Sequence, residues 1–138
     1  MIYTLYNQLK SIAEIEFDDI ITDTVIICSY SGFAKKLRIE LIDGTFIDIW
    51  YSAEGEYSFH WEQREIRNSI YRHDNAPHQK WSYVNTFPKH CHDGDDHNVI
   101  CSYLPNIPEE ALKTFLSIVR EKLLNLKSNQ TSNSGDLK

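Results

Sequence analysis

The sequence predicts a single α+β domain, in which an antiparallel β-meander of four to six strands is flanked by an N-terminal and a C-terminal helix. Runs of alternating apolar and polar residues fill the middle of the chain, and a period of two is typical of a half-buried strand. The dipeptide Asp43-Gly44 separates two of these runs, as it does in a tight hairpin. Apolar residues at helical spacing lie near both ends of the chain, which indicates that one helix precedes the strands in the sequence and another follows them.

The composition is that of an ordinary globular domain. The chain has 138 residues, of which 41% are hydrophobic and 25% charged, so one core is expected. No apolar run approaches the ~20 residues that span a bilayer, and the polar N-terminus does not resemble a signal peptide. A cytoplasmic protein without a membrane segment is therefore predicted. Three cysteines without CxxC spacing exclude a disulfide scaffold and a four-cysteine zinc site. The net charge of −6 excludes a wholly basic nucleic-acid binder.

The first half of the chain divides into a helix and a run of strands. A helix is expected near residues 4–14, where Leu5, Leu9 and Ile12 recur at helical spacing. Residues 20–30 are rich in β-branched side chains and predict a strand. Alternating runs on both sides of Asp43-Gly44 predict a hairpin, and the sequences YSFHWEQ and NSIYRHD extend the meander to about Tyr71.

The second half predicts a long loop, a last strand and a helix. Residues 74–97 hold two prolines, a glycine and most of the histidines, and loops of this length are often functional. A strand is expected in HNVICSYLP. Pro108 opens a helix over residues 108–125, whose apolar stripe is Leu112, Phe115, Leu116, Val119 and Leu123. The domain is expected to occupy residues 1–126, and the polar tail 127–138 is predicted to be disordered.

Charge and histidine content single out one segment. Residues 64–92 hold five Lys or Arg residues against Glu65 and Asp74, a net charge of +3, together with four of the six histidines. Perturbed titratable groups are common at functional sites. Residues 64–97 are therefore the region in which a functional site is expected.

The motifs in this region carry a resemblance to a known family. They are Tyr57-Ser58-Phe59-His60-Trp61, Tyr71-Arg72-His73-Asp74-Asn75-Ala76-Pro77-His78, Phe87-Pro88 with His90, His92-Asp93-Gly94, and Pro108-Glu109-Glu110-Ala111. From Leu37 to about Leu124 the chain resembles the TumE-type toxins of bacterial toxin–antitoxin systems. The resemblance implies a toxin held in check by a cognate antitoxin, which is expected to be a DNA-binding protein.

The residue types favour cleavage of RNA as the toxic activity. Attack of a 2′-hydroxyl on phosphate needs a base, an acid and a cation, roles that histidine and arginine suit. His73 and His92 are the preferred acid/base pair, His90 is the next candidate, and Arg72 is the expected phosphate ligand. In an extended segment Arg72 and His73 point to opposite faces, whereas His90 and His92 point the same way. The expected substrate contacts are Tyr71, Asn75, His78, Lys89 and His60.

Two alternatives stand beside this hypothesis. The histidines could satisfy hydrogen bonds within a polar loop, in which case the protein is a non-enzymatic interaction or regulatory module. His90-x-His92 with Asp93 and His97, completed by His73 or His78, also has the character of a metal site. No closed ligand motif can be read from the spacings, so the sequence predicts function without a bound metal or other cofactor.

Overall fold

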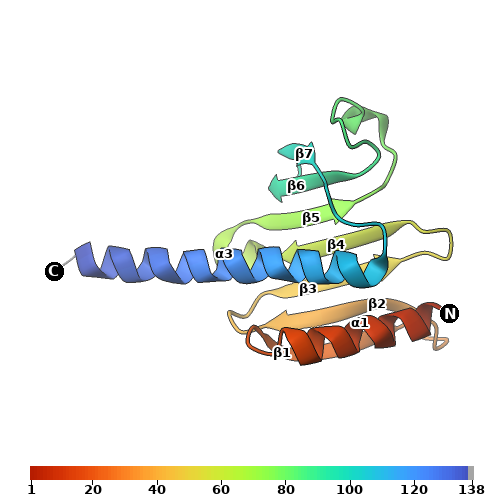
Figure 1. The fold of residues 1–138 in the computed structure, drawn as a ribbon, viewed down its shortest axis with the longest axis horizontal. Helices are drawn as coiled ribbons and strands as arrows, with labels where there is room; N and C mark the ends of the chain where they lie inside the picture. The colour runs from red at the N-terminus through yellow and green to blue at the C-terminus, as the bar shows by residue number, and fades with distance from the viewer. Residues whose placement is uncertain (137–138) are drawn as a thin grey trace.

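Seven antiparallel strands form one sheet in the computed structural model, which describes residues 1–136 and the side chains of residues 1–129. The strands lie in the order of the sequence, β1 to β7, and two long helices cover one face (Figure 1). The elements are α1 (Ile2–Glu16), β1 (Ile21–Cys28), β2 (Ala34–Leu41), β3 (Phe46–Tyr51), β4 (Tyr57–Glu62), α2 (Arg64–Arg67), β5 (Ile70–Asp74), the 3-10 turn η1 (Gln79–Trp81), β6 (His90–Gly94), β7 (Val99–Cys101) and α3 (Pro108–Asp136). The predicted α+β class is confirmed, while the strand count exceeds the four to six expected.

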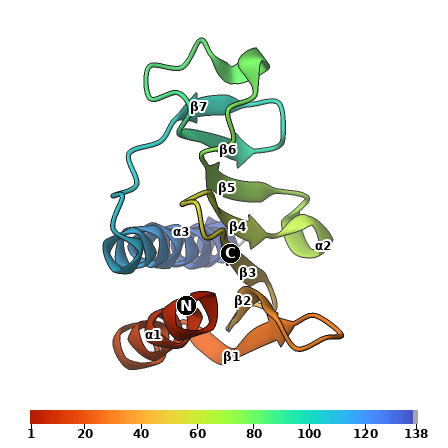
Figure 2. The ribbon, with the colours of Figure 1, turned by 90° about the vertical axis from the view of Figure 1, so that its right-hand side faces the viewer.

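The sheet has one face against the helices and one face without them. Figure 2 shows α1 and α3 side by side on the same side of the strands. Alternate residues of the central strands, among them Ile39, Ile47 and Phe59, are fully buried with the stripe of α3. An antiparallel meander can leave its other face polar, and the sequence alternates accordingly.

The central hairpin forms where the sequence predicts it. Ile39 pairs with Ile47 across β2 and β3, and Gly44 has a φ of 88° in the turn, a conformation that glycine adopts without strain. Residues 36–62 contain no helix. The alternation on both sides of Asp43-Gly44 was therefore sufficient to place this pair of strands.

The predicted loop at residues 74–97 is wrong in its second half. Residues 90–94 form β6, which pairs with β5 and carries β7 at its other edge. The sequence HCHDG has little intrinsic preference for a strand, and the pairing with β5 overrides it. This added strand places two histidines at fixed positions on the sheet.

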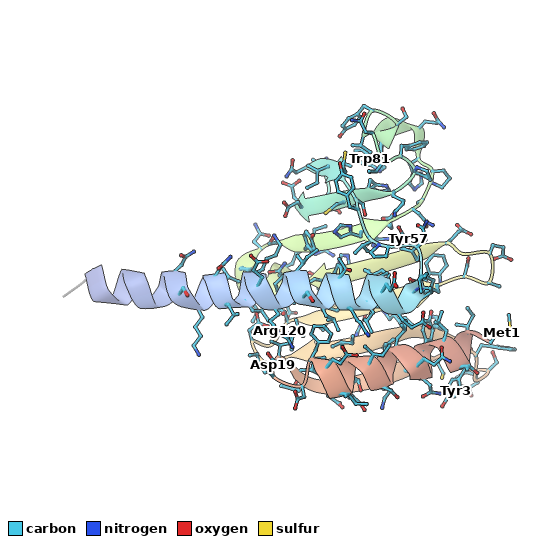
Figure 3. The ribbon with its side chains drawn as sticks, viewed as in Figure 1. Met1, Tyr3, Asp19, Tyr57, Trp81 and Arg120 are labelled. Atoms are coloured by element: carbon cyan, nitrogen blue, oxygen red, sulfur yellow. The ribbon has the colours of Figure 1, made fainter. Side chains whose placement is uncertain are left out.

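Helix α3 is longer than the expected 108–125. No proline or glycine interrupts the chain between Pro108 and Gly135, so nothing ends the helix when its apolar stripe ends. The guanidinium of Arg120 on α3 donates to Asp19 at 2.6 Å, where α3 passes the end of α1 (Figure 3). Residues 137–138 of the tail lie outside the described residues, and disorder of the segment 127–138 stays a prediction. None of the helices among residues 1–136 has the length and apolar character needed to cross a membrane.

Candidate functional site

The face of the sheet that lies away from α1 and α3, called here the open face, carries a continuous row of polar residues. Neighbours in this row are direct cross-strand partners, and the row runs Arg38, Asp48, His60, Arg72 and His92 from β2 to β6. The adjacent row is Leu37, Ile49, Phe59, His73 and Cys91, and it faces the helices. Because side chains alternate between faces, membership in one row or the other decides which residues share a site.

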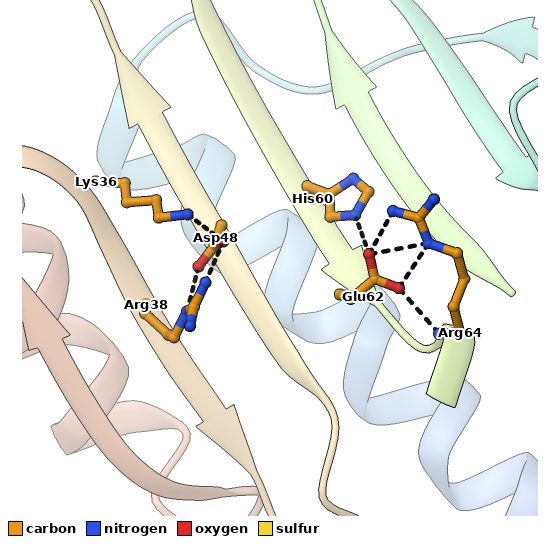
Figure 4. Close-up of polar contacts among 6 residues, drawn as sticks. All are labelled: Lys36, Arg38, Asp48, His60, Glu62 and Arg64. Atoms are coloured by element: carbon orange, nitrogen blue, oxygen red, sulfur yellow. Dashed lines mark hydrogen bonds and ion pairs between the residues drawn. The ribbon is translucent and has the colours of Figure 1, made fainter. Parts of the chain in front are cut away.

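Most charges on the open face are paired within small clusters. Asp48 accepts from Lys36 at 2.8 Å and from Arg38 at 2.8 and 2.9 Å (Figure 4). Glu62 accepts from Arg64 and lies 3.2 Å from His60. The hydrogen bond from Arg64 is the main reason that the pKa of Glu62 falls to about 2. The Asp48 cluster joins β2 to β3, with two cations on one carboxylate, whereas the Glu62 cluster joins the end of β4 to α2.

A different arrangement occurs where β5 meets β6. Asp74 is the cross-strand partner of His90, and Arg72 is the partner of His92, so all four side chains lie on the open face. The Nε2 atom of His90 lies 3.2 Å from Oδ1 of Asp74, and that of His92 lies 4.0 Å from Oδ2. Arg72 donates through Nε to Oδ2 of Asp74 at 2.9 Å. We call Asp74, His90 and His92 the triad.

The orientation of both triad imidazoles is determined by the backbone. Nδ1 of His90 lies 2.8 Å from the carbonyl oxygen of Pro88, and Nδ1 of His92 lies 3.1 Å from that of Asp96. A carbonyl oxygen only accepts, so each Nδ1 must carry the proton and donate. In the neutral form each Nε2 is then an unprotonated acceptor directed at Asp74. Burial, as the largest cause, lowers the pKa of His92 and favours this neutral form.

A cavity of about 330 Å³ opens beside the triad. The loop before β6 supplies one wall of the cavity. Trp81 belongs to this loop and lies beside β6 (Figure 3), with its ring centroid 5.4 Å from that of His92. Lys80 lies over the Trp81 ring at 4.7 Å. His78 is exposed and also lines the cavity. The site therefore combines buried acid and imidazole groups with a cationic and aromatic rim.

The structure separates the preferred acid/base pair. His73 is the cross-strand partner of Cys91 and faces the helices, whereas His92 is on the open face. The two could have met only at a strand end or a turn, and β5 continues through Asp74. The expectation that His73 and His92 lie in one site is therefore wrong, because the two side chains are on opposite faces of the sheet. Arg72, His90 and His92 do share a face.

His73 is instead part of the core. It is 5% exposed, and its two ring nitrogens lie 2.6 Å from the Ser102 hydroxyl and 2.8 Å from the Tyr71 hydroxyl. Its ring packs edge-on against Phe115 with centroids 5.9 Å apart. A neutral imidazole satisfies both hydroxyls, and the desolvation of the buried ring lowers the pKa of His73 to about 4.

This burial predicts a stability that falls in mild acid. The unfolded chain binds a proton at a pKa of about 6.5 and the folded chain at about 4, so the unfolded state holds more protons between these values. We expect His73 to remove up to about 3 kcal/mol from the free energy of unfolding as the pH falls from 7 to 4. Urea titrations at several pH values measure this loss. The variant His73→Gln should flatten the profile, and exposed His97→Gln should not; an unchanged profile in His73→Gln would contradict the assignment.

The other expected substrate contacts divide between the two faces and the loops. Tyr71 is in the core, stacked on Phe115, because it lies two residues from His73 and therefore on the same face of β5. Asn75 bridges the end of β5 to the β3–β4 turn through the backbone of Tyr57 and Gly55. Lys89 is anchored to Leu104 and Asn106 before α3, so its cation is used structurally.

His60 and His78 keep positions compatible with substrate contact. His60 is the direct partner of Arg72 on the open face, and His78 lines the cavity. The sequence reasoning missed Asp74 and Trp81 as site residues. The period of two, applied to Arg72 and Asp74, was the signal that could have placed Asp74 on the face of Arg72; nothing in the sequence places Trp81 over the histidines.

Comparison with known proteins gives one match. A family model described as Toxin TumE matches residues 10–123. No curated protein and no solved structure matches the chain.

Proposed function

Because the chain belongs to the TumE toxin family, whose model matches most of its length, we propose that this toxin acts by cutting RNA at the triad. The observation that carries the proposal is the convergence of Arg72, Asp74, His90 and His92 on one face beside a cavity. These four side chains come from two paired strands, and paired strands hold a catalytic constellation more rigidly than loops do.

The chemistry of RNA cleavage fits the positions of these groups. The 2′-hydroxyl attacks the neighbouring phosphorus, the bond to the 5′-oxygen breaks, and a cyclic phosphate remains. The attack requires a base at the 2′-hydroxyl, a proton for the departing 5′-oxygen and a cation at the phosphate oxygens. A triad imidazole that takes up the hydroxyl proton at Nε2 can return it to the 5′-oxygen as that bond breaks. Arg72 has 38% of its side chain exposed while its Nε is held by Asp74. Its terminal nitrogens are thus the groups presented to the phosphate.

The rim of the cavity supports a nucleic-acid substrate. Arg72 and Lys80 line the cavity together with the acidic Asp96, and these two cations attract a polyanion. Trp81 supplies an aromatic face, which every base can stack on in single-stranded RNA. These features suit an exposed single strand better than a duplex, whose bases are not accessible to stacking.

The family also implies the setting in which the toxin works. A toxin of this kind needs an inhibitor, so we expect a cognate antitoxin, and the proposal includes that it binds DNA. Because the proposed substrate is RNA, we expect the toxin to act in the cytoplasm. A neighbouring gene for a small DNA-binding protein would support this pairing.

The test of the proposal is unopposed expression with RNA profiling. Induction without an antitoxin should stop growth and produce new RNA 5′ ends that carry a hydroxyl, as the chemistry above requires. Arrested growth with intact RNA would overturn the ribonuclease proposal and leave a toxin that acts on another target. Normal growth would favour the non-enzymatic interaction module.

The phosphate contact gives a specific prediction. Arg72→Lys keeps the charge but loses the planar fork of donors, so we expect RNA cleavage to fall by about ten- to a hundredfold, which corresponds to one charged hydrogen bond of roughly 1.5–3 kcal/mol. Cleavage of a short single-stranded RNA by purified protein measures the effect. The matched control is Arg38→Lys, in the Asp48 cluster of the same face, which should cleave at the rate of the unmodified protein. Equal rates for Arg72→Lys and unmodified protein would exclude Arg72 as the phosphate ligand.

A further inference from the structure

We propose that the triad of Asp74, His90 and His92 binds a divalent first-row transition metal ion such as Zn²⁺. The spacing of these residues in the sequence gives no metal motif, and the set is assembled only by the register of β5 and β6. Binding of the ion by the triad does not depend on the proposed function. Only the catalytic role of the bound ion rests on the proposed function.

The ligand atoms already lie close to the separations that a metal requires. One ligand atom from each residue falls within 4.8 Å of the other two. Ligands about 2.0–2.2 Å from a zinc ion lie roughly 3.5 Å from one another in a tetrahedral shell. His90 lies 3.2 Å from Oδ1 of Asp74 and His92 lies 4.0 Å from Oδ2, so the side chains would move closer together around one ion.

The surroundings of both imidazoles are those of metal ligands. A metal-binding histidine typically donates its second ring N–H to a carbonyl or carboxylate, which directs the other nitrogen at the metal. His90 and His92 each do so, through the carbonyl groups of Pro88 and Asp96. The carboxylate of Asp74 is likewise held, by Arg72 and by the backbone N–H of Ala76.

The electrostatics of the triad accommodate a metal cation in addition to the Arg72 guanidinium that already donates to Asp74. Two Nε2 lone pairs and a carboxylate face one another among side chains that are each at most 7% exposed. Converging acceptors repel one another unless protons or a metal ion lie between them. Two imidazoles and one carboxylate are a recurrent ligand set for zinc and other divalent transition metals, and the mixed nitrogen and oxygen donors disfavour magnesium and calcium.

Three protein ligands leave a coordination position open to the cavity. Water bound there is acidic enough to exist as hydroxide near neutral pH. This hydroxide would accept the 2′-hydroxyl proton as the new phosphorus–oxygen bond forms, and the resulting water would return that proton to the departing 5′-oxygen. No oxidant or reductant is needed.

The experiment measures metal binding directly, separately from activity. Purified protein is stripped with a chelator and titrated calorimetrically with Zn²⁺, then with Co²⁺ while visible absorption is recorded. We expect one ion to bind per chain, visible absorption from protein-bound Co²⁺, and a higher melting temperature for the protein with the ion bound. His92→Gln and Asp74→Asn should each weaken binding at least about tenfold. The control Glu54→Gln, at the exposed β3–β4 turn and outside the cavity, should bind like the unmodified protein.

Each result has a defined meaning. Absence of stoichiometric binding in folded, unmodified protein would overturn the metal site and leave ribonuclease activity through the imidazoles intact. Binding that survives in His92→Gln and Asp74→Asn would also overturn it, because the ion would then lie elsewhere. Binding that the triad variants lose, in a protein that leaves RNA uncut, would uphold the metal site while the ribonuclease proposal fails.

Discussion

His92→Gln should lower the rate of RNA cleavage by about 10²–10⁴-fold and remove toxicity, since this is the usual cost of losing a group that promotes proton transfer. His92 is in the triad, 7% exposed, with its Nε2 directed at Asp74. Glutamine keeps a polar side chain of similar reach but supplies neither the imidazole base nor an equivalent metal ligand. Cleavage rates of a single-stranded RNA and growth on induction measure the two effects.

The matched control for this variant is Glu54→Gln, which changes an exposed residue of the β3–β4 turn, outside the cavity beside the triad. It should keep full toxicity, and thermal melts of both variants should resemble that of the unmodified protein. Full toxicity of His92→Gln would remove the triad from the mechanism. A collapsed melt in His92→Gln alone would instead assign His92 a structural role.

Phe115→Ala should lower the free energy of unfolding by about 3–5 kcal/mol, because it deletes a fully buried aromatic ring from the centre of the core. Phe115 lies on α3 at 0% exposure, and its ring centroid is 5.4 Å from that of Phe59 and 5.6 Å from that of Tyr71. It joins the helix to β4 and β5 together. Alanine leaves a cavity that β4, β5 and α3 would have to collapse to fill. Urea unfolding followed by circular dichroism measures the loss.

The control for this prediction is on the same helix. Leu124→Ala removes a side chain that is 59% exposed, and surface substitutions of this kind usually change stability by less than about 0.5 kcal/mol. A loss below about 1 kcal/mol for Phe115→Ala would show that α3 contributes little to the stability of the sheet. A loss as large in Leu124→Ala would show that the loss does not depend on burial in the core, because alanine is the better helix former and propensity alone would not destabilise this variant.

The two faces of β5 have separate tasks, which affects how histidine variants are interpreted. His73 bonds to Tyr71 and Ser102 beneath α3, while Arg72 and Asp74 project to the triad. Loss of toxicity in a His73 variant would therefore reflect reduced stability, and its melt should fall with its activity. Loss of toxicity in a His92 variant should occur without that fall.

The family was recognisable in the sequence from motifs such as Tyr71-Arg72-His73-Asp74 and His90-x-His92, and the match over residues 10–123 confirms it. The elements around the central hairpin were also predictable. A period of two around Asp43-Gly44 and the stripe from Leu112 to Leu123 are local signals, and both determine which side of a strand or helix is buried.

The membership of the site depended on the tertiary structure. Periodicity places Arg72 with Asp74 and His90 with His92, but it does not tell which pair of one strand faces which pair of the other. That depends on β6 pairing with β5 in the register that sets Asp74 opposite His90 and His73 opposite Cys91. A shift of β6 by one residue would have turned His90 and His92 to the face of His73, away from Arg72 and Asp74. The sequence by itself therefore determined the strands, the helices and the residue types of the site, while the long-range pairing of β5 with β6 decided which of those residues act together.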